Sequence, residues 1–270
     1  MVPPEGGRGR RPLSPAEWFG IMALLLSPGL WPLGAFWAAA PLTLFLLACA
    51  VMPFCPTSSF FLPVIGRGRT GQPLVSLTFD DGPTPTTTPL LLDLLDRYQV
   101  SATFFVVGER AERHPEIIGR ILAAGHGLGN HSYSHDDCIM FRSVDRLVAE
   151  IEATQEILRG YGVTTRFFRP PVGILTPRYA DALHRTGLLA VNFSRRARDM
   201  GNRRLRGLAE RTLRGLTGDD IILLHDTLPP GSEDVVLWLT EVEAIICGAR
   251  EKGVDFAPLA TLVADPPRRI

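Results

Sequence analysis

The chain of 270 residues is long enough for one large domain of roughly 200 residues and an appendage. Hydrophobic residues make up 46% of it, which is too much for a disordered protein. Its 28 basic residues balance its 28 acidic residues, so the chain lacks the broad positive field that binds a phosphate backbone. We therefore expect no nucleic-acid partner.

The cysteines favour neither a zinc ribbon nor a disulfide framework. Cys49, Cys55, Cys138 and Cys247 lie far apart in the sequence and form no C-x-x-C pair. Any metal site should therefore use histidine and carboxylate ligands rather than thiolates.

Residues 18–66 contain no charged side chain and are rich in Leu, Ala, Phe and Trp. As one helix this run would be about 74 Å long, against a hydrocarbon core of roughly 30 Å. The breakers Ser27-Pro28-Gly29 and Trp31-Pro32 interrupt it, so we expect a transmembrane hairpin over residues 16–30 and 33–53. The chain would then consist of a basic tail, a membrane segment and a catalytic domain, at residues 1–17, 18–66 and 67–270.

Two other arrangements of this segment stay open. A single span over residues 33–52 would leave the earlier apolar piece in the interface, and a cleaved signal or lipoprotein box would end near Ala48-Cys49-Ala50. Arginines flank the segment at positions 8, 10 and 11 before it and 67 and 69 after it. By the positive-inside rule, a hairpin in a bacterial inner membrane keeps the catalytic domain in the cytoplasm, whereas a single span places it outside. The lipid bilayer is an expected partner in both arrangements.

The rest of the chain alternates β-rich runs with helical patterns. Strands are predicted at residues 74–79, 102–107, 127–130, 166–169, 188–193, 221–224 and 254–256. Helices are predicted at residues 87–98, 115–124, 143–158, 176–186, 203–216 and 233–252. Strands separated by helices of 10–20 residues favour a parallel sheet, and about seven such units are enough to curl into a barrel. The fold class is therefore α/β.

Two adjacent carboxylates, Asp80 and Asp81, end the first strand before Gly82-Pro83 breaks the chain. Neighbours in a strand point to opposite faces, but a turn at its end can swing both toward one cavity. Taken alone, an Asp-Asp-Gly-Pro turn is common, because aspartate favours turns.

His131 and His135 follow a short strand and can bind one ion if this segment forms a helical turn. Together with a free carboxylate they would make a two-histidine, one-aspartate set with open coordination positions for water and substrate. By itself the pair is equally compatible with a helix surface.

Further polar residues follow three other strands, in the segments Arg169-Pro170-Pro171-Val172-Gly173, Asp199 and Leu223-Leu224-His225-Asp226. In a parallel barrel the carboxyl ends of the strands share one rim, where active sites are built. Five separate segments therefore bring polar residues to this rim. A shared active site explains this pattern better than chance does.

In their order and spacing, these five segments resemble the polysaccharide deacetylase domain of carbohydrate esterase family 4, the nodulation-protein-B homology domain. The resemblance covers about residues 71–262. It implies a distorted (β/α) barrel and metal-dependent hydrolysis of an N-acetyl amide on an amino sugar of a glycan or glycolipid, with release of acetate.

The resemblance also implies a role for each motif residue. Asp81, His131 and His135 would bind a divalent metal ion, usually Zn2+, with Co2+, Ni2+ or Mn2+ as alternatives. Asp80 would be the general base that activates the metal-bound water, whose pKa the metal lowers. His225 would protonate the leaving amine.

Supporting roles follow from the same resemblance. Arg169 would brace the base carboxylate, and Asp199 would orient the proton-donating histidine and keep it protonated; a surface ion pair is the structural alternative for both. The backbone N–H of Val172 would stabilise the oxyanion, with Pro170 beside it in the substrate site. Leu223 would line the pocket for the acetyl methyl group.

The sequence departs from the family pattern in the substrate region. Val172 stands where the family often has tyrosine, and Met200 replaces the usual tryptophan. Arg195, Arg196 and Arg198 precede Met200 and could meet a phosphate or uronate. A deformylase or deacetylase of a lipid-linked amino sugar is therefore the alternative activity. A catalytically silent sugar-binding membrane protein and a membrane scaffold are the alternatives outside catalysis, and the oligomeric state is left open.

Overall fold

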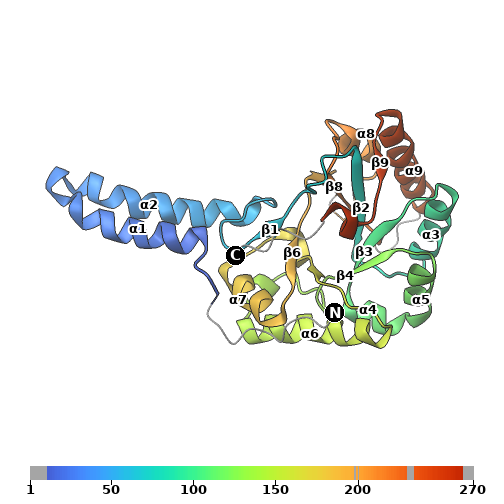
Figure 1. Ribbon diagram of the computed structural model, residues 1–270, viewed down its shortest axis with the longest axis horizontal. Helices are drawn as coiled ribbons and strands as arrows, with labels where there is room; N and C mark the ends of the chain where they lie inside the picture. The colour runs from blue at the N-terminus through green and yellow to red at the C-terminus, as the bar shows by residue number, and fades with distance from the viewer. Residues whose placement is uncertain (1–10, 198, 200, 230–233, 264–270) are drawn as a thin grey trace.

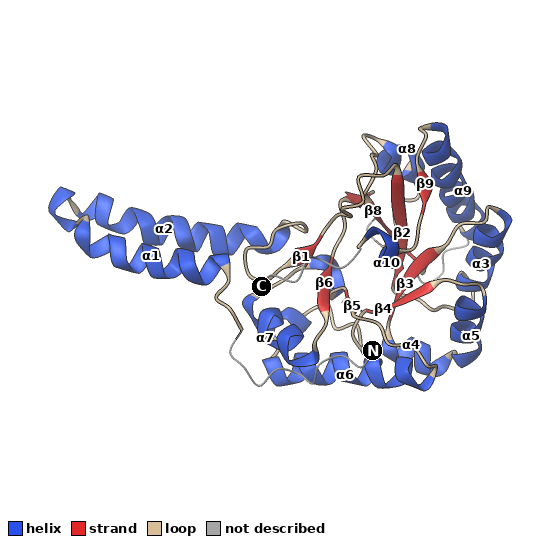
Figure 2. Cartoon of the chain, viewed as in Figure 1, coloured by secondary structure: helices blue, strands red, loops and turns tan. Residues whose placement is uncertain are grey.

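The computed structural model describes residues 11–197, 199, 201–229 and 234–263. A curled parallel sheet with helices packed around it forms the main body, and a helical hairpin projects from one side (Figure 1). Figure 2 shows the strands lining the inside of this body and the helices on its outside. The α/β barrel expected from the sequence is thus confirmed.

The strands run in the hydrogen-bonded order β1-β6-β5-β4-β3-β2-β8-β7, and β9 pairs with β2 outside this path. Their bounds are β1 Val64–Ile65, β2 Leu74–Asp80, β3 Ala102–Val106, β4 Gly127–Asn130, β5 Phe167–Phe168, β6 Leu189–Val191, β7 Arg195–Arg196, β8 Ile221–His225 and β9 Asp255–Phe256. All of these strand pairs are parallel. An isolated antiparallel bridge between Arg67 and Asp220 connects the chain after β1 to the start of β8.

The helices are α1 Pro15–Gly29, α2 Ala35–Val51, α3 Thr88–Arg97, α4 Gly108–Arg113, α5 Pro115–Ala123, α6 Val144–Gly160, α7 Pro177–Thr186, α8 Leu208–Leu213, α9 Val235–Glu251 and α10 Leu259–Leu262. Short 3-10 turns lie at Trp31–Leu33, Met52–Phe54, Ile139–Phe141 and Pro171–Gly173. Each of the seven predicted strands has a counterpart, and the additional short strands are β1 and β7. The helix predicted over residues 203–216 is shorter, because Gly207 and Gly215 adopt left-handed φ values of 70° and 67° on either side of α8.

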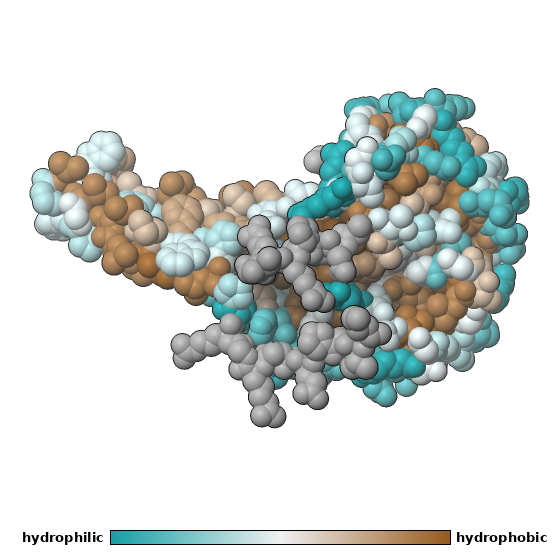
Figure 3. Space-filling view, in the orientation of Figure 1, coloured by the Kyte–Doolittle hydropathy of each residue, from teal (hydrophilic) through white to brown (hydrophobic). Residues whose placement is uncertain are grey.

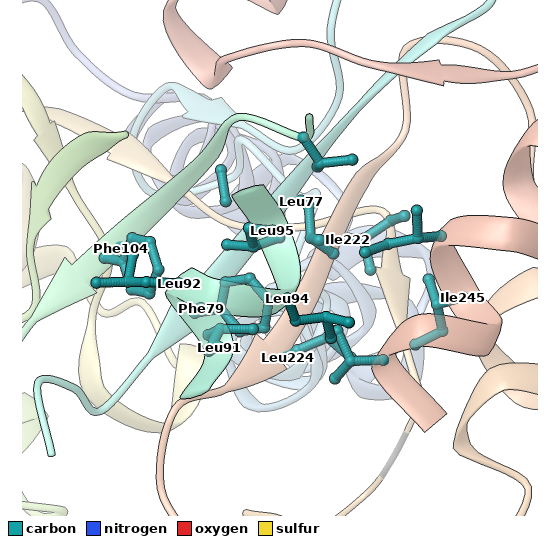
Figure 4. Close-up of a cluster of buried hydrophobic side chains, with 14 of the residues drawn as sticks. Leu77, Phe79, Leu91, Leu92, Leu94, Leu95, Phe104, Ile222, Leu224 and Ile245 are labelled. Carbon is teal, nitrogen blue, oxygen red and sulfur yellow. The ribbon is translucent and has the colours of Figure 1, made fainter. Parts of the chain in front are cut away.

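The main core lies between the sheet and the helices α3 and α9 (Figure 4). Leu77 and Phe79 of β2 are fully buried there, and Phe79 stacks on Phe104 of β3 with ring centroids 5.4 Å apart. Burial of one such side chain contributes about 1.5–3 kcal/mol. Because side chains alternate along a strand, the same packing turns Thr78 and Asp80 toward the inside of the barrel.

The parallel register brings the ends of neighbouring strands to one rim. Asp80 of β2 lies opposite His225 of β8 on one side and Phe105 of β3 on the other. Asn130, the last residue of β4, lies opposite Phe168 of β5. The segments that follow these strands therefore start from the same edge of the sheet.

Helices α1 and α2 form the projecting hairpin. The side chain of Ser14 accepts a hydrogen bond from the N–H of Glu17, whose carboxylate accepts one from the N–H of Ser14, and this capping box starts α1. In the described part of the chain, one helical stretch, Ala35–Phe54, is long and apolar enough to cross a membrane. The predicted membrane segment ran to residue 66, but Val64–Ile65 pairs with β6 and thus belongs to the sheet.

Candidate active site

Asp80 and Asp81 diverge at the end of β2. Asp80 is still part of the strand and is buried at 4% exposure, whereas Asp81 has a left-handed φ of 70°. This turn brings both carboxylates to the same rim. Gly82 follows because a Cβ at this position would lie 2.5 Å from the Oδ2 atom of Asp226.

The segment that carries His131 and His135 is a loop and not the helical turn expected from their spacing. Ser132 and His135 have left-handed φ values of 64° and 52°. The carboxylate of Glu150 on α6 accepts hydrogen bonds from the N–H groups of Tyr133 and Ser134, at 3.2 and 2.8 Å, and from the Ser134 hydroxyl at 3.0 Å. These bonds stabilise a conformation that brings the two histidines together without a helix.

Asp81, His131 and His135 converge on one point. The Oδ1 atom of Asp81 lies 3.4 Å from Nε2 of His131 and 3.0 Å from Nε2 of His135. One ligand atom from each of the three residues fits within 4.8 Å of the others. Burial raises the pKa of Asp81, but its hydrogen bonds with the two histidines lower it to well below the ordinary value.

This set fits a divalent cation. Two atoms bound to the same zinc ion lie no more than about 4 Å apart, and both measured distances are shorter. The Nδ1 atom of His131 lies 2.8 Å from the carbonyl oxygen of Arg169. If Nδ1 carries the proton for this bond, the Nε2 lone pair is free to bind a metal. Two histidines and one carboxylate leave coordination positions open.

Arg169 is fully buried and binds Asp80. Its Nη1 atom donates to Oδ1 of Asp80 at 2.6 Å and to the hydroxyl of Thr78 at 2.8 Å. The other guanidinium nitrogens donate to the carbonyl oxygens of Val191 and Asn192, at 3.3 and 3.1 Å. The structural alternative of a surface ion pair is therefore wrong for Arg169.

His225 and Asp199 form a second buried pair. The Nδ1 atom of His225 lies 2.8 Å from Oδ2 of Asp199, whose side chain is 1% exposed. Burial lowers the pKa of His225, but the hydrogen bond to Asp199 and the charges of Asp81 and Asp80 raise it to about 9. The pair is thus not a surface ion pair either, and in the absence of a cation the imidazole is protonated at neutral pH.

The predicted substrate residues lie around these groups. Val172 is 46% exposed and has a left-handed φ of 54°, a conformation that is rare for a β-branched residue. Pro170 precedes it in the loop that follows Arg169. Leu223 lies two residues before His225 on β8 and so points to the same face of the sheet, one layer deeper.

The loop that begins with Arg195 and Arg196 is only partly available for binding an anion. The side chain of Arg195 donates to Asp220 at 2.8 Å and to the carbonyl oxygen of Arg214 at 2.9 Å, while the guanidinium of Arg196 lies 5.8 Å from the centre of the Phe193 ring. Arg198 and Met200 lie outside the described residues. Arg195 therefore has a structural role in the described part of the loop.

Sequence reasoning missed Glu150 and Asn192, which support the site, and assigned no role to Asp226. Glu150 binds the histidine loop, and Asn192 accepts from Arg169. Asp226 accepts from the hydroxyls of Thr87 and Thr88, at 2.7 and 2.5 Å, beside the aspartate turn. Glu150 had one signal in the sequence, since it is a charged residue on the apolar side of the helix predicted over residues 143–158.

Several proteins of known structure share this fold. The Bc1960 peptidoglycan N-acetylglucosamine deacetylase superimposes with a TM-score of 0.67 at 30% identity, covering 74% of this chain and 92% of that chain. A pseudoenzyme of carbohydrate esterase family 4 from Bacillus anthracis has a TM-score of 0.66 at 21% identity, covering 74% and 68%. A pseudoenzyme shares the fold, so the fold alone does not indicate activity.

Sequence relatives agree with the structural ones. A chitooligosaccharide deacetylase of Sinorhizobium fredii is 38% identical over 173 residues, which are 63% of this chain and 80% of the relative. A peptidoglycan-N-acetylglucosamine deacetylase of Bacillus cereus is 29% identical over 71% of this chain and 89% of its own length. The polysaccharide deacetylase family model matches residues 67–191. With the barrel and the site on its rim, these matches show that the chain belongs to the polysaccharide deacetylase family.

Proposed function

We propose that this protein hydrolyses the N-acetyl group of an amino sugar in a glycan or glycolipid and releases acetate. The observation that carries the proposal is the convergence of Asp81, His131 and His135 beside Asp80, with the buried His225–Asp199 pair on the same rim. Relatives that act on N-acetylated glycans support the substrate class.

The reaction needs a proton acceptor on the attacking water and a proton donor for the leaving amine. A divalent cation at the three ligands, which we propose is Zn2+ with Co2+, Ni2+ or Mn2+ as alternatives, would lower the pKa of a bound water and polarise the acetamide carbonyl. Asp80 accepts the proton from the attacking water, and the hydrogen bond from Arg169 orients its carboxylate. His225 donates a proton to the nitrogen of the breaking amide bond, and Asp199 keeps this imidazole protonated and oriented.

The substrate would lie against the loop that contains Pro170 and Val172. The N–H of Val172 donates to the developing oxyanion, and a backbone donor serves here whichever side chain the residue carries. Leu223 closes the end of the pocket around the acetyl methyl group. With valine in place of tyrosine, this wall of the sugar site is smaller and apolar.

A second candidate is deacetylation or deformylation of an amino sugar that is linked to a lipid. The observation that favours it is the exposed apolar hairpin next to the barrel, which we propose is a membrane anchor. A catalytically silent sugar-binding protein is disfavoured, because each residue type that the reaction needs is present at the rim. A scaffold function would not require the buried carboxylate of Asp80 and its hydrogen bond from Arg169.

Two variants test the assignment. Asp80→Asn should keep the metal and lose most of its turnover, since the amide cannot accept the proton. His131→Ala should lose both metal and activity. Metal content is measured by elemental analysis and activity by released acetate. Normal turnover in the first variant would remove Asp80 from the role of base, and unchanged metal content in the second would refute the ligand assignment.

A further inference from the structure

We propose that the hairpin of α1 and α2 enters the bilayer from the cytoplasmic face with both of its ends on that face. The hairpin would thereby seat the rim of the active site at the lipid headgroups, where an amino sugar carried on a membrane lipid reaches it. This inference rests on the proposed deacetylase function and names the form in which the substrate is presented.

Small residues of α1 lie buried in the hairpin, and many of its large apolar side chains are exposed, whereas a hairpin in water would bury its large apolar side chains. The buried residues of α1 are small, namely Ala16, Gly20, Ala23 and Ser27. A Cβ at Gly20 would lie 3.0 Å from the Phe45 ring, so the small residues let the two helices approach closely. Phe19 and Phe45 also meet between the helices, with ring centroids 5.7 Å apart. Many other large apolar side chains of the hairpin are exposed, at 49% to 76%, namely Leu24, Leu25, Leu26, Trp31, Leu33, Phe36, Trp37, Leu44, Leu46 and Leu47.

The lack of charged side chains and the length of α2 favour lipid as the surroundings of the hairpin. None of residues 18–66 is charged, so neither the two helices nor the connection at Trp31–Leu33 would place a charged side chain in the hydrocarbon. Together with the turn that follows it, α2 forms the stretch Ala35–Phe54, which is long enough to cross a membrane. With 15 residues and about 22 Å, α1 is shorter than the hydrocarbon core of roughly 30 Å. Figure 3 shows apolar side chains along the visible face of the hairpin, while hydrophilic residues cover much of the barrel.

Both ends of the hairpin are fixed to the barrel. Before α1, Arg11 pairs with Asp181 of α7 at 2.6 Å. In the first turn of α1, the N–H of Ala16 donates to the carbonyl oxygen of Phe60, which lies in the segment between α2 and β1, at 2.9 Å. After α2, the chain enters β1, which pairs with β6. In Figure 1 the two helices run side by side and project away from the barrel. An arrangement in which only α2 crosses the membrane would have to break the first set of contacts.

The end of α2 leads directly to the active-site rim. Pro56, two residues after the last apolar turn at Met52–Phe54, accepts a hydrogen bond from the side chain of Asn192 at 2.9 Å. The same amide donates to the carbonyl oxygen of Gly173, next to Val172, at 3.3 Å. Two residues of chain span at most about 7 Å. The loop that contains Pro170 and Val172 therefore lies close to Phe54, where the apolar stretch of α2 ends.

The side of the membrane follows from the flanking charges. Arg8, Arg10 and Arg11 precede the hairpin, and Arg67 and Arg69 follow it. Arginines that flank a short membrane segment are retained in the cytoplasm. Since both flanks are basic, both are assigned to the cytoplasmic face.

Topology is tested with the full chain in a bacterial inner membrane. A green fluorescent protein, which fluoresces inside the cell, and alkaline phosphatase, which is active outside it, are fused in turn to each terminus. Fluorescence without phosphatase activity at both termini is the expected result. Reporters active on opposite sides, or phosphatase activity at both ends, would overturn the proposal.

The presentation of the substrate is tested with the full chain in vesicles of phosphatidylethanolamine and phosphatidylglycerol. The probes are dodecyl N-acetylglucosaminide in the vesicles and soluble tri-N-acetylchitotriose, and the signal is released acetate. We expect kcat/KM at least about 10-fold higher for the lipid probe, with a rate that follows its surface fraction. Equal or faster hydrolysis of the soluble probe refutes the inference and keeps the deacetylase, whereas hydrolysis of neither probe refutes the proposed function.

A matched pair of variants separates the anchor from the barrel. Leu25→Asp places a charge on the exposed face of α1, and Val236→Asp places the same charge on the exposed start of α9. In the first variant, a smaller fraction of the protein should co-float with vesicles. Its rate on the lipid probe should fall about 10-fold, and its rate on chitotriose should stay unchanged. The second should behave as the wild type. Undiminished flotation of Leu25→Asp contradicts the proposed membrane contact.

Discussion

Arg169 and His131, 38 positions apart in the sequence, are joined by a hydrogen bond of 2.8 Å between the Arg169 carbonyl oxygen and the His131 ring. The side chain of the same arginine donates to Asp80 at 2.6 Å. One residue therefore fixes both the orientation of a proposed metal ligand and the carboxylate of the proposed base. Groups beyond the direct ligands tune a metal site in this way.

Arg169→Lys should reduce kcat by about 100-fold or more, because an ammonium cannot replace the planar guanidinium that binds Asp80, Thr78 and two carbonyl oxygens at once. Unfolding measurements should show a loss of about 1–3 kcal/mol from buried groups left without a partner. Arg159→Lys, on the exposed side of α6, is the control and should change neither quantity. A kcat within twofold of the wild type would show that Arg169 does not orient the base.

Glu150→Ala should weaken metal binding about 10- to 100-fold, since its carboxylate accepts three hydrogen bonds from the loop between the two histidines. Competition with a chelator measures the affinity directly. Glu152→Ala on the same helix is the matched control, because its side chain is 45% exposed and lies 3.7 Å from Arg159. Equal affinities of the two variants would refute a role of Glu150 in shaping the site.

Much of the fold and of the site could be predicted because the relevant signals are local. Alternating strands and helices indicated the parallel barrel, and the motifs at strand ends indicated the rim. The conformation of the histidine loop could not be predicted from spacing, because Glu150 stabilises the left-handed Ser132 and His135 through contacts made only in the folded chain. Strand β1 was missed for a different reason: Val64–Ile65 lies in the charge-free run, and composition alone does not separate an apolar strand from a membrane segment.

Asp199→Asn should move the basic limb of the pH profile of kcat to lower pH. Burial lowers the pKa of His225, and the hydrogen bond and charge of Asp199 more than compensate, so without them the imidazole loses its proton at a lower pH. A bound cation lowers the pKa of His225 in both proteins, and the comparison between them gives the effect of Asp199. Asp255→Asn, on the exposed β9, is the control. Superimposable profiles would show that His225 does not depend on Asp199 for its proton.

Asp226→Asn should change how the stability of the protein depends on pH. Burial raises the pKa of Asp226 to about 7, although hydrogen bonds from Thr88 and Thr87 oppose the increase. The folded protein thus retains a proton that the unfolded chain releases near the ordinary carboxyl pKa of 3.8. The free energy of unfolding therefore falls as the pH rises from about 4 to about 7, and this contribution is lost above the folded-state pKa.

Asparagine does not titrate, so the melting temperature of the variant minus that of the wild type should increase between about pH 5 and about pH 8. Thermal unfolding in detergent measures this difference, and Asp93→Asn on the exposed side of α3 should show no such trend. A difference that stays constant across this range would mean that the carboxyl group of Asp226 is already ionised at about pH 5 in the folded protein.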